Sequence, residues 1–182
     1  MSAEVTHQAR GDGWDGILDP GEVIQWQGRP DPAVKFQLSH IVTVVFGLLF
    51  SGFALFWMIT AARSGDLFWM FGLIHFSVGL SILIGPIYGP SWRRRHTWYT
   101  LTDRRAFIAT DIPFRGRKLT AYPIAGDTVI SIEEADDFST VHFAHEMKSR
   151  KNGSTRHDIG FERIPDGRDV YARLRAIRAA AA

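Results

Sequence analysis

Two long apolar runs constrain this chain more than any other feature of its sequence. Residues 41–62 and 67–88 are each 22 residues long and contain no Asp, Glu, Lys or Arg. As an α-helix, each run would be about 33 Å long, and the hydrocarbon core of a bilayer is about 30 Å thick. Buried helices of soluble proteins usually keep a polar face, and these runs have none. We therefore expect two transmembrane helices, at 41–62 and 67–88.

The connection between the two runs is very short. Only four residues, 63–66, separate them, which is too few to cross a bilayer again. The helices are therefore expected to form an antiparallel hairpin with both flanks on one side of the membrane. Lys and Arg are enriched in cytoplasmic flanks, and arginines at 93–95 follow the second run while the connection contributes only Arg63. Both termini are therefore expected in the cytoplasm.

Small side chains recur at helical spacing in both runs. Small residues allow membrane helices to approach each other closely. The simple interpretation is that the two stripes face each other, and the alternative is that one of them docks a partner protein. The residues are Gly47, Ser51 and Ala54 in the first run and Gly72, His75 and Gly79 in the second.

His75 is the one histidine inside either run. An ionisable residue at that depth is a functional candidate, for example as a proton relay or a ligand. A relay needs further titratable groups, and haem held between helices usually needs paired ligands, neither of which the two runs provide. We favour a neutral imidazole that is hydrogen-bonded to Ser51 or Ser81 within the hairpin.

The flanks of the hairpin differ in charge. Residues 1–40 carry three Lys or Arg and six Asp or Glu, and they lack the apolar core of a signal peptide. They are expected to form a cytoplasmic N-terminal segment. Residues 91–182 carry seventeen Lys or Arg and twelve Asp or Glu. The chain contains no cysteine, which excludes disulfides, thiolate metal sites and cysteine nucleophiles.

The region after the arginines has the pattern of a small β domain. Residues 97–101 and 106–110 flank a polar turn, which predicts a β-hairpin. The tail is predicted to be helical, because Val170, Leu174 and Ile177 recur at i, i+4 and i+7. We expect an α+β membrane protein whose domain at 91–182 is a small antiparallel β-barrel or sandwich capped by the C-terminal helix. Further strands are expected at 119–124, 128–135, 139–147 and 155–164.

Two motifs resemble those of a known family. Residues 19–32, DPGEVIQWQGRPDP, resemble an element of the form PGE…W-x-GRP, and residues 98–107, WYTLTDRRAF, resemble an opening hairpin of the form Y-x-LT-x-RR. With the paired spans, they resemble bacterial PH-like domain membrane proteins, in which the domain follows a transmembrane hairpin. The resemblance implies a seven-stranded PH-like barrel with a C-terminal helix. It also implies scaffolding at the bacterial inner membrane, with self-association, rather than chemistry. Whether residues 22–27 add a strand stays open.

The sequence contains no recognisable enzyme or metal site. His142 and His145 are three residues apart on a predicted strand, so they would point to opposite faces and could not share a metal ion. Neither a nucleophile elbow nor a phosphate-binding loop is present. Nucleic acid is a poor fit, because no reading motif occurs and the domain is tethered. We expect neither an enzyme nor a cofactor.

The basic residues support two interpretations. They form either solvated turns plus a topology signal, or contacts with anionic headgroups, which contribute about 1 kcal/mol per basic residue near the surface. The function we expect is a membrane-anchored adaptor that binds other membrane proteins or copies of itself, for example as an accessory subunit of an inner-membrane complex. The alternative is a module that binds anionic lipids at the cytoplasmic leaflet. The candidate headgroup contacts are Arg93, Arg94, Arg95, Arg115, Arg117 and Lys118.

Overall fold

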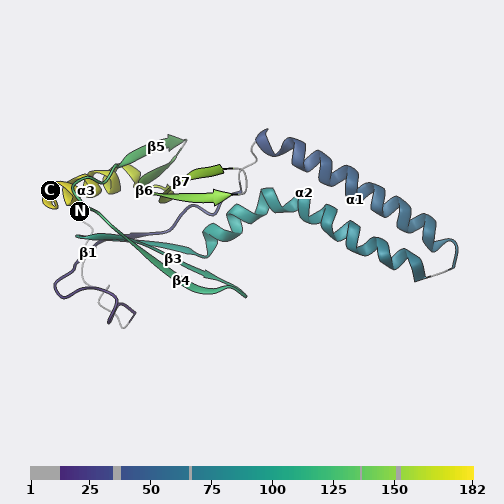
Figure 1. Cartoon of the computed structure of the whole chain (residues 1–182), viewed down its shortest axis with the longest axis horizontal. Coiled ribbons are helices and arrows are strands. Elements are labelled where there is room, and N and C mark those ends of the chain that lie inside the picture. Colours follow the sequence, from purple (N-terminus) through teal and green to yellow (C-terminus); the bar gives the residue numbers. More distant parts are fainter. Residues whose placement is uncertain (1–12, 35–37, 66, 136, 151–152) are drawn as a thin grey trace, which may run out of the picture. The chain divides into compact units, whose positions relative to one another are not determined.

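Two compact units make up the chain (Figure 1). The hairpin unit is Pro32–Arg95, and the β unit combines the segment that ends at Asp31 with His96–Ala182. The β unit is therefore built from both sides of the hairpin unit in the sequence. The computed structural model describes residues 13–34, 38–65, 67–135, 137–150 and 153–182.

The hairpin unit consists of two long helices, α1 (Ile41–Ala62) and α2 (Phe71–Arg95). A short 3-10 helix precedes each of them, η1 (Leu38–His40) and η2 (Leu67–Met70). With these extensions, both helices are long and apolar enough to cross a membrane, with mean hydropathies of 2.2 and 2.0. The two helices expected from the uncharged runs are thus present.

Helix α2 extends beyond the expected end of the second run at residue 88. The expected end was set by the last apolar residues, whereas the helix continues through Pro90 and includes three arginines in its last turn. Cations are favourable there, because the free carbonyl groups give the C-terminus of a helix a partial negative charge. Ser91 and Arg94 also donate hydrogen bonds to the carbonyl groups of Pro32 and Ala33, ahead of α1.

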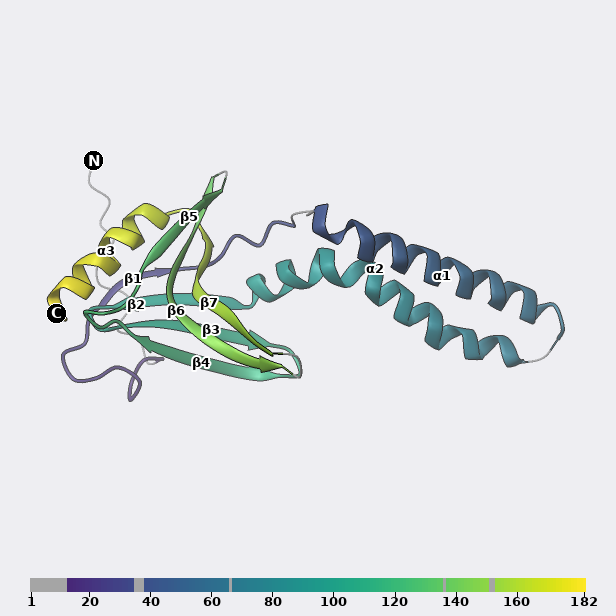
Figure 2. The ribbon, with the colours of Figure 1, turned by 45° about the horizontal axis from the view of Figure 1, so that its top comes forward.

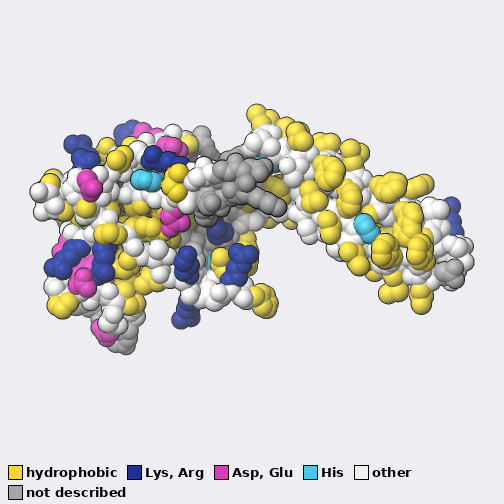
Figure 3. Space-filling view, viewed as in Figure 1, with side chains coloured by type: hydrophobic (Ala, Val, Ile, Leu, Met, Phe, Trp, Pro, Cys, Tyr) yellow, Lys and Arg dark blue, Asp and Glu magenta, His cyan; other side chains and the backbone are white. Residues whose placement is uncertain are grey.

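Hydrophobic side chains cover the outer surface of the hairpin unit (Figure 3). Only 22% of the most apolar stretch of the first helix and 11% of that of the second are buried. The core helices of a soluble protein are mostly buried, so this degree of exposure suits helices that lipid surrounds. Charged side chains gather instead on the β unit (Figure 3).

Four antiparallel strands form the first sheet of the β unit, in the order β1–β2–β3–β4. The predicted hairpin is confirmed, since β2 pairs with β3 from Thr97 opposite Thr110 to Leu101 opposite Ala106. The strand left open by the sequence is also present, because β1 pairs with β2. The bounds are Ile24–Gly28 for β1, Thr97–Thr102 for β2, Arg105–Ile112 for β3 and Gly116–Pro123 for β4.

Three further antiparallel strands form the second sheet, in the order β5–β6–β7, and the helix α3 follows it (Figure 2). No strand pairing joins the two sheets within the described residues, so the expected barrel is not closed. The local sequence pattern locates strands, but it does not determine which strand edges pair. The bounds are Ser131–Ala135 for β5, Phe138–Arg150 for β6, Gly153–Ile164 for β7 and Gly167–Ala180 for α3.

The two sheets and α3 enclose one hydrophobic core. The Phe161 ring of β7 packs against the Tyr99 ring of β2, with ring centroids 4.8 Å apart, and meets the Phe143 ring of β6 edge to face at 4.9 Å. The three apolar positions predicted for α3 face this core, since Val170 and Leu174 are fully buried and Ile177 is nearly so. Burial of each such side chain stabilises the fold by about 1.5–3 kcal/mol.

Candidate functional site

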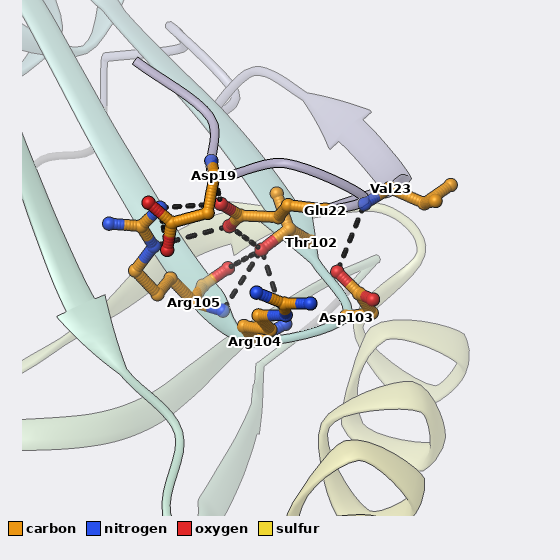
Figure 4. Close-up of polar contacts among 7 residues, drawn as sticks. All are labelled: Asp19, Glu22, Val23, Thr102, Asp103, Arg104 and Arg105. Carbon is orange, nitrogen blue, oxygen red and sulfur yellow. Dashed lines mark hydrogen bonds and ion pairs between the residues drawn. The ribbon is translucent and has the colours of Figure 1, made fainter. Parts of the chain in front are cut away.

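A buried polar cluster joins the segment before the hairpin unit to the turn after β2 (Figure 4). At its centre is Glu22, whose side chain has no exposed surface. The Glu22 carboxylate accepts hydrogen bonds from the Arg105 guanidinium (Nε to Oε1, 3.2 Å), the Thr102 hydroxyl (2.6 Å) and the Asp19 amide (2.9 Å). Arg105 also pairs with the Asp19 carboxylate at 3.0 Å. We call these four residues the Glu22 clasp.

The turn between β2 and β3 is organised around the same cluster. The Thr102 hydroxyl accepts hydrogen bonds from the amides of Arg104 (3.3 Å) and Arg105 (2.9 Å). Asp103 exchanges two hydrogen bonds with Val23, one through its amide (3.1 Å) and one through its carboxylate (3.0 Å). The predicted turn therefore binds the part of the pre-hairpin segment that lies just before β1, at residues 19–23.

The protonation of Glu22 follows from these contacts. Burial alone would raise the pKa of Glu22, but hydrogen bonds from Arg105, Thr102 and the Asp19 amide outweigh this effect and lower the pKa to about 2. In return, the hydrogen bond to Glu22 is the main cause that raises the pKa of Arg105. Glu22 is therefore ionised throughout the physiological pH range.

The Glu22 clasp has no acceptor capacity left for chemistry. An ionised carboxylate offers about four acceptor positions. Two nitrogens of Arg105, the Thr102 hydroxyl and the Asp19 amide supply four donors to Glu22. A carboxylate that is saturated and permanently charged is a poor general base and a poor metal ligand. The cluster is therefore structural, and it holds the two flanks of the hairpin unit together.

Two further contacts tie the pre-hairpin segment to the β unit. Asp31 forms a mostly buried ion pair with Arg163 of β7, and its amide donates a hydrogen bond to the Arg163 carbonyl at 2.8 Å. The guanidinium of Arg29 lies over the Trp98 ring, 4.5 Å from its centroid. The motif residues Glu22, Arg29 and Asp31 are thus used for internal contacts.

The small-residue stripes lie at the contact between α1 and α2. A side chain added at Gly79 would come within 2.8 Å of the Ser51 backbone nitrogen, and one at Gly47 within 2.7 Å of the Leu83 nitrogen. A side chain added at Gly72 would overlap the side chain of Met58. Gly47, Ser51 and Ala54 on α1, and Gly72 and Gly79 on α2, are all buried. These stripes face each other, as in the simpler of the two interpretations.

His75 lies outside this contact, contrary to its expected place in the stripe. Its side chain is exposed, and Nδ1 lies 3.4 Å from the Phe71 carbonyl oxygen, one turn earlier. The hydroxyl groups of Ser51 and Ser81, proposed as its partners, donate instead to the carbonyls of Gly47 and Ser77. A serine in a helix can bond to the carbonyl four residues back, and both serines do so.

A shallow apolar groove runs beside His75 between the two helices. Its volume is about 200 Å³. The side chain of His75 stands next to the Phe71 ring, with centroids 5.2 Å apart, and near that of Phe50 at 6.4 Å. The remaining lining is apolar, which suits a surface that faces lipid chains. The groove is lined by Phe50, Phe53, Ala54, Trp57, Phe71, Gly72 and His75.

The candidate headgroup contacts fall into separate groups. Arg93, Arg94 and Arg95 form the last turn of α2. Arg115 lies in the turn between β3 and β4, and Arg117 and Lys118 open β4. The three residues of this second group are exposed, and Arg117 pairs with Asp111 at 3.1 Å.

The two histidines of β6, His142 and His145, differ in their exposure. His142 is partly buried, with Nε2 3.8 Å from a Glu133 carboxylate oxygen, whereas His145 is exposed. Within the described residues, no three His, Asp or Glu side chains converge as metal ligands. Glu134, near the end of β5, pairs with Arg168 of α3 at 2.6 Å.

Comparison of the chain with protein-family models, curated proteins and solved structures finds no significant match. Sequence reasoning missed the role of Glu22. The available signal was a glutamate just before the apolar residues Val23 and Ile24, together with the arginine pair 104–105 after β2. It also did not single out Phe114, which Arg115, Arg117 and Lys118 follow in the sequence.

Proposed function

We propose that this chain is a membrane-anchored adaptor, in which a PH-like domain is held at the cytoplasmic face of the bacterial inner membrane by a helical hairpin. The observation that carries the proposal is the pairing of β1 with β2. These two strands are neighbours in one sheet, yet the whole hairpin unit lies between them in the sequence.

The strand pairing restricts how the chain can cross a membrane. Two strands can share a ladder of hydrogen bonds only if both lie on the same side of the bilayer. The segment between β1 and β2 must then cross an even number of times. Two helices of spanning length, joined by a short connection, meet this condition. The arginines in the last turn of α2 favour the cytoplasmic side for both flanks.

The layout of the β unit supports the PH-like part of the proposal. A four-stranded and a three-stranded antiparallel sheet, followed by a C-terminal helix, agree with the seven strands and capping helix that the resemblance implies. The residues that carry the resemblance are used in the Glu22 clasp and its neighbouring contacts. Such contacts support a structural role of the motif in holding the β unit together.

The outer faces of the hairpin unit are the surfaces on which an adaptor would bind a partner within the membrane. The small-residue stripes pack against each other within the hairpin, so a partner would contact the outer faces of the two helices. Those faces present large exposed side chains, among them Phe46, Phe53 and Phe56 of α1. The partner we propose is another membrane protein or a second copy of the chain, docked through these faces.

The topology is tested with single cysteines, because the chain has none of its own. Ser64→Cys lies in the connection between the helices, and Ala182→Cys marks the C-terminus. In intact cells, a membrane-impermeant maleimide is expected to label Ser64→Cys from the outside and to leave Ala182→Cys unlabelled until the inner membrane is opened. Equal labelling of both positions would contradict the hairpin.

The adaptor role is tested by the mass of the native particle. The full chain, extracted from its own membrane into lipid nanodiscs, is expected to run as an assembly with a fixed stoichiometry in native mass spectrometry. A strictly monomeric particle that keeps its native lipids would contradict the adaptor role, although it would leave the topology untouched.

A further inference from the structure

The turn between β3 and β4 carries a side chain that the β unit does not use. Phe114 at its tip is 108% exposed. Its backbone φ is 68°, in a region that bulky residues rarely adopt. The Arg115 amide closes the turn by donating a hydrogen bond to the Ile112 carbonyl at 3.0 Å. In turns of this kind, Gly or Asn normally occupies the position with positive φ.

The only other described non-glycine residue with a positive φ has an internal explanation. Arg163, with a φ of 50°, is held by its ion pair with Asp31 and by the hydrogen bond from the Asp31 amide. Phe114 has no comparable contact, since its ring is fully exposed. A strained backbone that presents a bare aromatic ring indicates a function outside the domain.

Three basic residues follow this ring within four positions of the sequence. Arg115, Arg117 and Lys118 are exposed, and Asp111 offsets one of these charges through its pair with Arg117. Residues 111–118 therefore carry three positive charges and one negative charge. A turn that combines an exposed aromatic ring with cations has the composition that suits a membrane interface, where the ring enters between headgroups and the cations meet lipid phosphates.

The strand register determines at which end of the sheet this turn lies. Thr97, the first residue of β2, is opposite Thr110, and the Asp111 amide bonds to the His96 carbonyl at 2.9 Å. The turn follows directly after this point, at the end of the sheet where the chain arrives from α2. Because β1 is antiparallel to β2, β1 leaves the sheet toward α1 at the same end. The β2–β3 turn, with Arg104, lies at the opposite end.

We propose that the β3–β4 turn docks onto the anionic leaflet in which the hairpin unit is anchored. Phe114 inserts between the headgroups, and Arg115, Arg117 and Lys118 contact the lipid phosphates. This inference rests on the proposed membrane anchor and cytoplasmic orientation. The anchor makes docking intramolecular, so a contact that is weak in free solution is sufficient to hold the domain at the surface. The leaflet is the occupant that matches both the charge and the position of the turn.

The test uses the full chain in nanodiscs and one environment-sensitive probe. An NBD fluorophore is attached to Phe114→Cys, where it replaces the phenyl ring, in discs of phosphatidylcholine alone or with phosphatidylglycerol. The matched control carries the probe at Arg104→Cys, which is also an exposed position in a basic turn but at the other end of the sheet. Aqueous iodide and lipids with a spin label in the acyl chain serve as quenchers from the two sides.

In anionic discs at low salt, we expect the probe at position 114 to shift its emission to the blue. We also expect the spin-labelled lipid to quench it several times more strongly than it quenches the probe at 104. Raising the salt to 0.5 M shortens the screening length to roughly 4 Å and should reverse the shift. Adding Arg115→Glu, Arg117→Glu and Lys118→Glu to the Phe114→Cys chain should abolish it.

Two results would overturn the docking proposal. One is equal access of iodide to positions 114 and 104 in anionic discs, and the other is an identical signal from position 114 in neutral and anionic discs. Failure of the underlying anchor has a different signature, because the chain would then not enter nanodiscs and Ser64→Cys would not be labelled from outside.

Discussion

Replacing Glu22 by Gln tests whether the clasp holds the pre-hairpin segment in place. Gln has nearly the same volume as Glu but no charge, so the change removes the ionic part of the cluster and leaves the packing intact. Arg105 then loses its buried carboxylate partner and keeps only the more exposed Asp19, at 3.0 Å. The substitution leaves the hydrophobic core unchanged.

The expected cost follows from the contacts. Breaking a buried ion pair by removing one partner costs about 3–5 kcal/mol. Arg105 is partly exposed and retains Asp19, which reduces the cost to about 2–3 kcal/mol. The same contacts lower the pKa of Glu22 from 4.5 to about 2, which corresponds to about 3 kcal/mol of stabilisation.

Hydrogen exchange of the β1 amides measures this effect in the full chain. Strand β1 follows Glu22 directly, so opening of the clasp exposes its amides to exchange. We expect the protection of residues 24–28 to fall by about 30- to 150-fold in Glu22→Gln at neutral pH. The matched control is Glu134→Gln, the same substitution in the exposed pair with Arg168, which should leave β1 exchange unchanged.

The dependence on pH has a definite sign. A carboxylate whose pKa is lowered by folding stabilises the native state above its unfolded pKa, and this stabilisation is lost as the pH falls through the native pKa. For Glu22 the relevant window runs from about pH 4.5 down to about pH 2. Gln does not titrate, so the difference between wild type and variant should close across this window. Wild-type protection of β1 in the variant at pH 7, or a difference that persists undiminished at pH 2, would refute the reasoning.

Two further substitutions test the helix contact and the core, each with its own control. Gly79→Ala places a methyl group 2.8 Å from the Ser51 backbone and should destabilise the hairpin by about 1–3 kcal/mol, measured as thermal loss of helical circular dichroism in nanodiscs. Gly52→Ala meets open space and should have no such effect. Leu174→Ala should lower the free energy of unfolding of the β unit by about 2–5 kcal/mol in urea titrations followed by tryptophan fluorescence, because Leu174 is fully buried. The exposed Arg175→Ala should change it little, and equal effects of the two would contradict the assigned face of α3.

Local patterns were sufficient to predict several elements. The absence of charge over two runs of 22 residues located both helices of the hairpin. Two short runs of strand-forming residues around a polar turn located β2 and β3, and the spacing of Val170, Leu174 and Ile177 located both α3 and its buried face. These signals are short in range, so the sequence displays them directly.

Other features depend on contacts that are distant in the sequence. Glutamate is almost never fully buried without a partner, and the partner of Glu22 lies 83 positions away, beyond the hairpin unit. The split into two sheets is likewise a matter of which edges pair. Phe114 could not be predicted in a left-handed conformation, because the residue type disfavours it. His75 was misplaced because helical spacing alone does not determine which edge of a stripe faces the neighbouring helix.

The central claim is that the two flanks of the hairpin unit meet in one sheet on one side of a membrane. It is tested most directly by a disulfide between Gln27→Cys and Thr100→Cys, in a chain that has no other cysteine. Gln27 is opposite Thr100 in the register, and their side chains are hydrogen-bonded at 3.2 Å. In native membranes, mild oxidation is expected to form a disulfide between the two cysteines. The chain is then cleaved in the connection at Ser64, which puts one cysteine on each fragment. The two fragments are expected to separate only under reducing conditions. Fragments that separate without a reductant, while a control pair at Trp98 and Ala109 of β2 and β3 cross-links, would contradict the account.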